Sequence, residues 1–145
     1  MKGSGKDEEL NLTKKNHKEF EEESKANLIS LAFKYHAEAN IEEASKYYQL
    51  FLDRGFNDPR VFINYGAIYK QLGENDEAVK LYKKCMELYP DSPEAYFNIA
   101  IIYRDIGKQT EAEDMSLKAI ELKPDFAEAY FNLANVYMDD AKFNE

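Results

Sequence analysis

The chain has 145 residues, of which 19 are Lys or Arg and 28 are Asp or Glu, so its formal net charge is −9. Such acidity argues against a nucleic-acid or anionic-membrane partner, because both repel an acidic chain whose basic residues are not clustered. Hydrophobic residues make up 44% and aromatic residues 14% of the chain, which is too apolar for disorder throughout and predicts one folded unit.

The cysteine and histidine content argues against a disulfide or a structural metal. Cys85 is the single cysteine, and with His17 and His36 it supplies too few ligands for a four-ligand zinc site. Residues 1–9 turn acidic where a secretory signal needs an apolar segment, and no apolar run approaches the ~20 residues of a membrane span. We therefore expect a cytoplasmic protein without cofactor or metal.

The first 24 residues are charged and poor in apolar side chains. They contain five Lys and seven Asp or Glu, so they bury little surface against a core. We expect residues 1–13 to form a mobile tail and Thr13 to cap a charged helix, because a threonine hydroxyl accepts a hydrogen bond from the free N–H groups of a first turn. The sequence therefore predicts a charged tail and helix extension over residues 1–24.

From residue 25 onward the sequence repeats with a period of 34 residues. The side chains that coincide at this spacing are Tyr35, Tyr69, Tyr103 and Tyr137, together with Ala44, Ala78 and Ala112. Within each period the apolar residues recur at spacings of three and four, which predicts two amphipathic helices per unit. A single pair of such helices cannot hide its apolar face, so neighbouring pairs are expected to stack.

One unit shows the pattern most fully, in Phe62, Tyr65, Gly66, Tyr69, Ala78, Tyr82 and Pro90. With its 34-residue period, this pattern resembles the tetratricopeptide repeat family. The resemblance implies an all-α fold, a right-handed α-solenoid of stacked antiparallel helix pairs with a concave inner face. The expected units are a degenerate repeat at 25–58, full repeats at 59–92 and 93–126, and the first helix of a truncated repeat at 127–145.

Small residues mark the expected ends of the first helices. Gly73 and Gly107 stand where each helix stops and a positive φ is favoured, whereas Ala39 and Ala141 take that place in the outer units and fit it less well. Ser116 stands where the two preceding units have Tyr. This replacement predicts looser packing of the second helix in the third unit.

The resemblance also implies that ligands bind to inward-facing side chains of the first helices. The expected groove residues are Arg60, Ile63, Asn64, Ala67, Lys70, Phe97, Asn98, Ile101, Arg104, Phe131, Asn132 and Asn135. Asn64, Asn98 and Asn132 form a column of primary amides, which either grips the main chain of a peptide or forms local hydrogen bonds. The apolar side chains beside the column either anchor a ligand or pack between adjacent first helices.

The groove lacks the basic residues of the carboxylate clamp, the variant of this family that binds the acidic C-termini of heat-shock chaperones. The clamp positions here are Ile63, Ala67, Glu94, Phe97, Asn98 and Phe131. Among the places that the clamp uses only Arg60 is basic, so the sequence argues against a chaperone clamp. The groove bases lie toward its N-terminal side and the acids toward its C-terminal side, so we expect a bound peptide to be oriented by its own charges.

No arrangement of residues predicts catalysis. Cys85 is interpreted as an inert core thiol, and Asp139 and Asp140 are adjacent on a helix and so point in different directions. We therefore expect a non-enzymatic scaffold whose groove binds a peptide segment or a helix of a partner protein. Two alternatives stay open: the substrate-recruiting N-terminal region of a longer enzyme such as a transferase, and self-association through the unpaired helix at residues 127–140.

Overall fold

The computed structural model describes residues 4–143, and all regular secondary structure in that range is α-helical. The expectation of an all-α fold is therefore confirmed. The composition predicted one folded unit, whereas the chain divides into two compact units, one ending at Asn57 and the other beginning at Asp58. None of the helices in the described range is both long enough and apolar enough to span a membrane.

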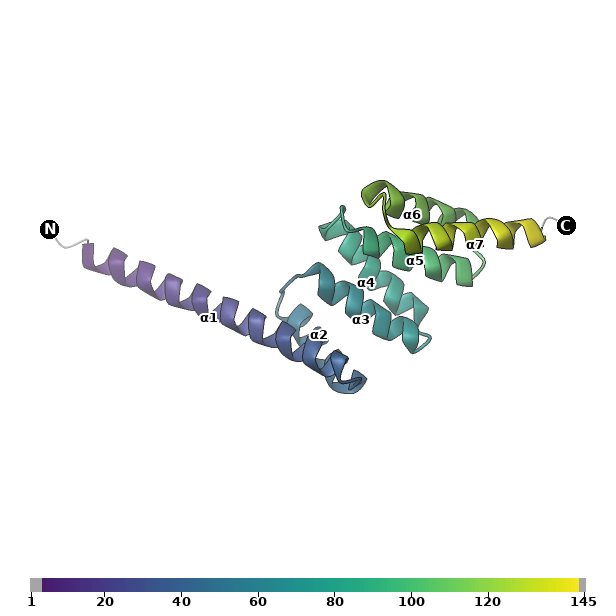
Figure 1. The fold of residues 1–145 in the computed structure, drawn as a ribbon. Coiled ribbons are helices and arrows are strands. Elements are labelled where there is room, and N and C mark those ends of the chain that lie inside the picture. Colours follow the sequence, from purple (N-terminus) through teal and green to yellow (C-terminus); the bar gives the residue numbers. More distant parts are fainter. Residues whose placement is uncertain (1–3, 144–145) are drawn as a thin grey trace. The chain divides into compact units, whose positions relative to one another are not determined.

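The first unit consists of two helices that pack against each other, α1 (Ser4–Ala37) and α2 (Ile41–Asp53) (Figure 1). Their buried side chains are Leu28 and Ala32 from α1 and Ala44, Tyr48 and Phe51 from α2. The Nδ1 atom of His36 lies 2.9 Å from the Tyr48 hydroxyl, and burial lowers the pKa of His36. A second polar contact joins Arg54, at the end of α2, to the Ser24 hydroxyl of α1 at 3.1 Å, so the interface combines apolar packing with polar contacts.

Helix α1 begins far earlier than the sequence suggested. Thr13 lies inside the helix, where its hydroxyl donates to the Glu9 carbonyl at 3.0 Å, so the expected cap is wrong. The expected tail is likewise helical from Ser4 onward, and residues 1–3 lie outside the described residues. The physical reason is that no Gly or Pro interrupts the sequence between positions 6 and 37, and an ion pair between Lys15 and Glu19 supports the exposed turns.

The second unit stacks five helices in chain order (Figure 1). They are α3 (Pro59–Gln71), α4 (Asn75–Leu88), α5 (Pro93–Asp105), α6 (Gln109–Leu122) and α7 (Ala127–Phe143). Each helix packs on the next, and α5 also contacts α3 and α7. The expected stack of antiparallel helix pairs is therefore observed in this unit.

The core of the second unit lies between successive helix pairs. One cluster joins Ala78 and Tyr82 of α4 to Ile99 and Ile102 of α5. A second cluster consists of Tyr96, Ala119, Phe126 and Ala129 and joins α5 to α6 and to the start of α7. Because each cluster draws side chains from two neighbouring pairs, burial of apolar surface holds the stack together.

Four turns close the helix ends with the same backbone pattern. At the end of α3 the Glu74 N–H donates to the Tyr69 carbonyl at 2.8 Å, and the Gly73 N–H donates to the Lys70 carbonyl at 3.0 Å. The residue at the turn has a positive φ in every case: 79° at Gly73 and Gly107, 77° at Gly55 and 56° at Ala39. Ala39 thus adopts the left-handed conformation with a Cβ atom, which is the poorer fit that the sequence predicted.

The last expected turn does not form. Ala141 lies within α7, which runs to Phe143, so the expectation that it ends the helix is wrong. In the inner units a glycine with positive φ ends the first helix, and position 141 has an alanine that is compatible with continued helix. An alanine at this repeat position therefore allows α7 to continue to Phe143, whereas Ala39 at the equivalent position adopts a positive φ in the turn after α1.

Candidate functional site

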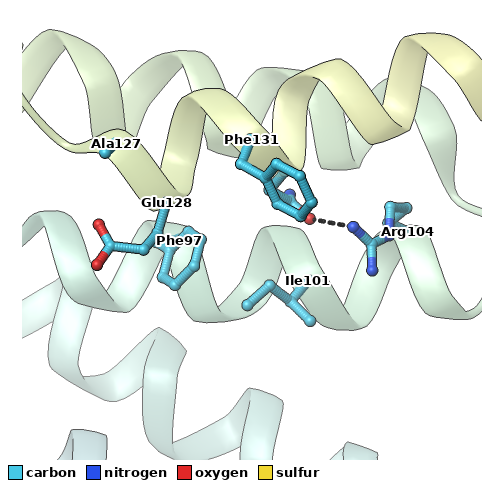
Figure 2. A pocket seen from close by; sticks show the side chains of 7 residues that line it. Phe97, Ile101, Arg104, Ala127, Glu128 and Phe131 are labelled. Carbon is cyan, nitrogen blue, oxygen red and sulfur yellow. Dashed lines mark hydrogen bonds between the residues drawn. The ribbon is translucent and has the colours of Figure 1, made fainter.

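A hollow of about 540 Å³ opens between α5 and α7 in the second unit. Its lining residues are Phe97, Ile101 and Arg104 from α5 and Ala127, Glu128, Phe131 and Asn132 from α7. Five of the twelve predicted groove residues are therefore brought together here. Figure 2 shows the apolar side chains between Glu128 on one side and Arg104 on the other.

The two phenylalanines of the hollow differ in their surroundings. Phe131 is 71% exposed, which is unusual for so large an apolar side chain. Phe97 is half-buried, and its ring centroid lies 4.8 Å from that of Phe126. Phe97 therefore packs within the stack and forms a wall of the hollow, whereas most of the Phe131 ring is open to solvent.

Asn132 is the centre of a polar network that reaches the hollow from inside the stack. It is only 2% exposed, and its Nδ2 donates to the hydroxyl of Ser116 on α6 at 3.1 Å. Its Oδ1 accepts a hydrogen bond from the guanidinium of Arg104 at 2.8 Å (Figure 2). Buried amides are stable only when such partners satisfy them, so this network fixes the side chains it joins.

The same network bears on two expectations from the sequence. Ser116, where looser packing was expected, is fully buried and accepts a hydrogen bond from Asn132. Asn132 itself is buried and bonded, and it is therefore not a free amide for the main chain of a peptide. The side chain of Asn98 donates to the Glu94 carbonyl of its own helix at 2.8 Å, which is the local hydrogen bond that the sequence left as an alternative.

Most of the remaining predicted groove residues lie on α3 rather than on α5 or α7, and their exposure differs. Ala67 is exposed, and the half-buried ones are Ile63, Asn64, Lys70 and Asn135. Ile63 packs against the buried cluster of α4 and α5, so it belongs at least partly to the core. Asn135 lines a second hollow of about 540 Å³ near the C-terminal ends of α5 and α7, together with Arg104, Asp105, Gly107, Gln109, Met138, Asp139 and Lys142.

Arg60 is a groove base whose charge is already matched. Its Nε and one terminal nitrogen donate to the two carboxylate oxygens of Asp58 at 3.0 and 2.7 Å. Asp58 also caps α3 by accepting from the Arg60 backbone N–H at 2.9 Å. Hydrogen bonds to Asp58 raise the pKa of Arg60, which therefore stays charged but is neutralised at the helix start.

Cys85 has the surroundings of a core residue. It is fully buried on α4, and burial raises the pKa of its thiol to about 11. Thiol reactivity requires the thiolate, so this environment suppresses it at neutral pH. Among residues 4–143, no group of three or more His, Cys, Asp or Glu side chains is arranged to hold a metal ion.

Two sequence profiles described as tetratricopeptide repeat match the chain, over residues 58–125 and 116–145. Together they span more than half of the sequence. None of the curated proteins compared with the chain matches it significantly.

Several solved structures have the same fold. MamA has 25% sequence identity and a TM-score of 0.72, and the match covers 81% of this chain and 64% of MamA. The type III secretion chaperone SycD of Yersinia enterocolitica, in complex with a peptide of the translocator YopD, has 24% identity, a TM-score of 0.73 and coverage of 81% and 95%. The first TPR of Spaghetti (RPAP3), bound to the HSP90 peptide SRMEEVD, has 21% identity, a TM-score of 0.75 and coverage of 81% and 93%.

Proposed function

The chain belongs to the tetratricopeptide repeat family, and from this premise we propose that it is a non-enzymatic interaction scaffold. Its ligand is a peptide segment of a partner protein, which binds in the groove between α5 and α7. The observation that carries the proposal is the hollow of about 540 Å³ in which Phe131 is 71% exposed. Concave, largely apolar sites with a few polar groups are where proteins bind ligands.

The composition of the hollow supports a peptide as the ligand. Aromatic and aliphatic side chains supply the apolar contact that dominates peptide recognition, and charged groups at the edges give direction. SycD and the first TPR of RPAP3, which have the same fold, were both solved with peptides bound. The likeness to them concerns the fold, so the ligand of this chain is inferred from its own side chains.

A peptide selection tests this proposal directly. A random 12-residue library displayed on phage is selected on the full chain and on F131A, which removes the exposed ring. We expect the wild-type chain to enrich a family of peptides and F131A to lose at least tenfold of their binding. Phe131 is too exposed for its truncation to leave a cavity, so the fold of F131A should persist by circular dichroism.

The matched control is L117A on α6. Leu117 is 45% exposed and does not line the hollow, so its truncation removes a similar apolar surface elsewhere in the same unit. L117A should bind the selected peptides as the wild type does. If the wild-type chain enriches no peptides, or if F131A and L117A bind them equally, the groove is not the binding site.

A further inference from the structure

The network behind the hollow points to the kind of peptide that the groove selects. Resting on the proposed function, we propose that the groove takes an extended segment in which a bulky apolar residue has a basic neighbour on one side and an acidic neighbour on the other. The apolar side chain packs against Phe131, the acidic side chain binds Arg104, and the basic one faces Glu128 (Figure 2).

Arg104 carries the acidic end of this motif. It lines both hollows, and its side chain is 24% exposed, so it stands where the apolar part of the groove meets the polar part. Its hydrogen bonds to Asn132 at 2.8 Å and to Asp105 at 3.3 Å use two of the five N–H groups of a guanidinium. The guanidinium therefore keeps N–H groups for a carboxylate of the ligand. The contact with Asp105 is long, so it neutralises the positive charge of Arg104 only in part.

Ser116 and Asn132 act on Arg104 as positioning residues. The Ser116 hydroxyl accepts from Asn132, which leaves the Asn132 oxygen directed at Arg104. An arginine held in place loses less side-chain entropy when it binds a carboxylate than a mobile one does. Ser116, which stands in place of a repeat tyrosine, therefore influences the groove from α6 by fixing Asn132 and, through it, Arg104.

The dimensions of the hollow set the length of the motif. Phe97 and Arg104 are seven residues apart on α5, which corresponds to about 10 Å along a helix axis. An extended chain covers that length in about three residues. The basic, apolar and acidic residues are therefore expected within a segment of three to five residues, and their order fixes the direction in which the peptide lies.

This motif is distinct from the clamp that the sequence excluded. A clamp places several basic side chains at inward positions that are Ile63, Ala67, Glu94 and Phe131 here. Arg104 lies elsewhere, in the last turn of α5, and an apolar surface adjoins it. The groove is therefore expected to recognise an internal segment with a mixed charge pattern rather than an acidic C-terminus.

The first test compares the peptides selected from the phage library by the wild type and by R104Q. We expect wild-type peptides to carry Asp or Glu within two residues of the bulky apolar residue, and R104Q peptides to keep the apolar residue without the acid. An unchanged acid preference in R104Q, or its absence in the wild type, overturns this inference while the groove assignment stands. Selection of no peptides at all overturns the groove assignment as well.

The second test uses one selected peptide and a twin in which its acid is replaced by the corresponding amide. Fluorescence anisotropy should give about tenfold weaker binding of the amide twin to the wild type, as expected for loss of a charged hydrogen bond. The ratio should fall to about one for R104Q and should shrink for S116A. K118Q, which removes a lysine of α6 outside both hollows, should leave the ratio unchanged.

The ratio between twins separates positioning from a general loss of structure. A misfolded or loosened S116A protein would weaken both peptides equally and leave their ratio at the wild-type value. That outcome, or a wild-type ratio of one, contradicts the assigned roles of Arg104 and Ser116.

Discussion

At the scale of single residues, the repeats show how a large buried side chain at one position limits the size of the residue that packs against it. Gly66 and Tyr82 are both buried, and a Cβ atom added at Gly66 would collide with the Tyr82 ring. One period later the same two positions hold Ala100 and Ser116, so an alanine stands there together with a serine in place of the tyrosine. The corresponding residues in the first unit are Ala32 and Tyr48, both buried, so a repeat can also combine alanine with tyrosine at these two positions.

The first prediction is that G66A destabilises the protein only while Tyr82 is present. The added methyl group must displace a fully buried ring, and overpacking of this kind costs about 1–3 kcal/mol of unfolding free energy. In a Y82L background the ring is gone, and G66A should be neutral or stabilising because alanine favours a helix over glycine by about 0.5–1 kcal/mol.

Urea denaturation of the wild type, both single variants and the double variant measures this coupling. A100G is the matched control. It should lose the helix preference of alanine, about 0.5–1 kcal/mol, and the burial of its fully buried methyl group, about 1 kcal/mol. Equal effects of G66A in the two backgrounds would show that the ring does not set the requirement for glycine.

At the scale of elements, the helix ends show what could and could not be predicted. The turns at Gly73 and Gly107 could be predicted from the sequence, because glycine is the residue that adopts a positive φ without strain. The start of α1 was not, since it depends on a long stretch of moderate helix propensity rather than on a cap. The end of α7 was misplaced because the repeat pattern was carried onto Ala141.

The second prediction concerns the turn at Ala39. Its φ of 56° places an alanine in the left-handed region, which costs about 1–2 kcal/mol. Glycine adopts this conformation without strain, and its only cost is the larger conformational entropy of the unfolded chain. A39G should therefore raise the free energy of unfolding by about 0.5–1 kcal/mol, measured by urea denaturation.

The reciprocal control is G73A, which places an alanine in the equivalent turn at φ 79°. No atom outside its chain neighbours lies within 4 Å of a Cβ atom at Gly73, so the expected loss of about 1 kcal/mol reflects backbone conformation alone. A destabilising effect of A39G would mean that the alanine methyl group makes contacts that outweigh the strain.

The candidate site was predictable to the extent that it follows helix periodicity. The 34-residue spacing placed Phe97, Ile101, Arg104 and Phe131 on first helices, and these residues line one hollow. The hydrogen bonds of Asn132 could not be read from its repeat position, because they depend on Ser116 on another helix. The serine in place of tyrosine at position 116 was the sequence feature that could have indicated this network. Its effect is on Asn132, which lies on the next helix.

At the scale of the whole molecule, charge is dispersed over the surface in a way that does little for stability. Most ion pairs among the described residues join side chains three or four positions apart on one helix, and these side chains are mainly exposed. Exposed pairs of this type contribute little to stability, because solvent and salt screen them. The net charge of −9 acts in the opposite direction, because repulsion among the excess acidic groups disfavours the compact state.

The third prediction is that added salt stabilises the protein at neutral pH. Raising the ionic strength from about 0.01 to about 0.1 M shortens the Debye length from about 30 to about 10 Å, which screens repulsion between distant acids more than attraction within close pairs. The Tm followed by circular dichroism should therefore rise by a few degrees in NaCl at pH 7. Near pH 4.8, where the net charge vanishes, the same salt step should change the Tm little. A fall in Tm with salt at pH 7 would show instead that the local ion pairs outweigh the excess of acidic charge.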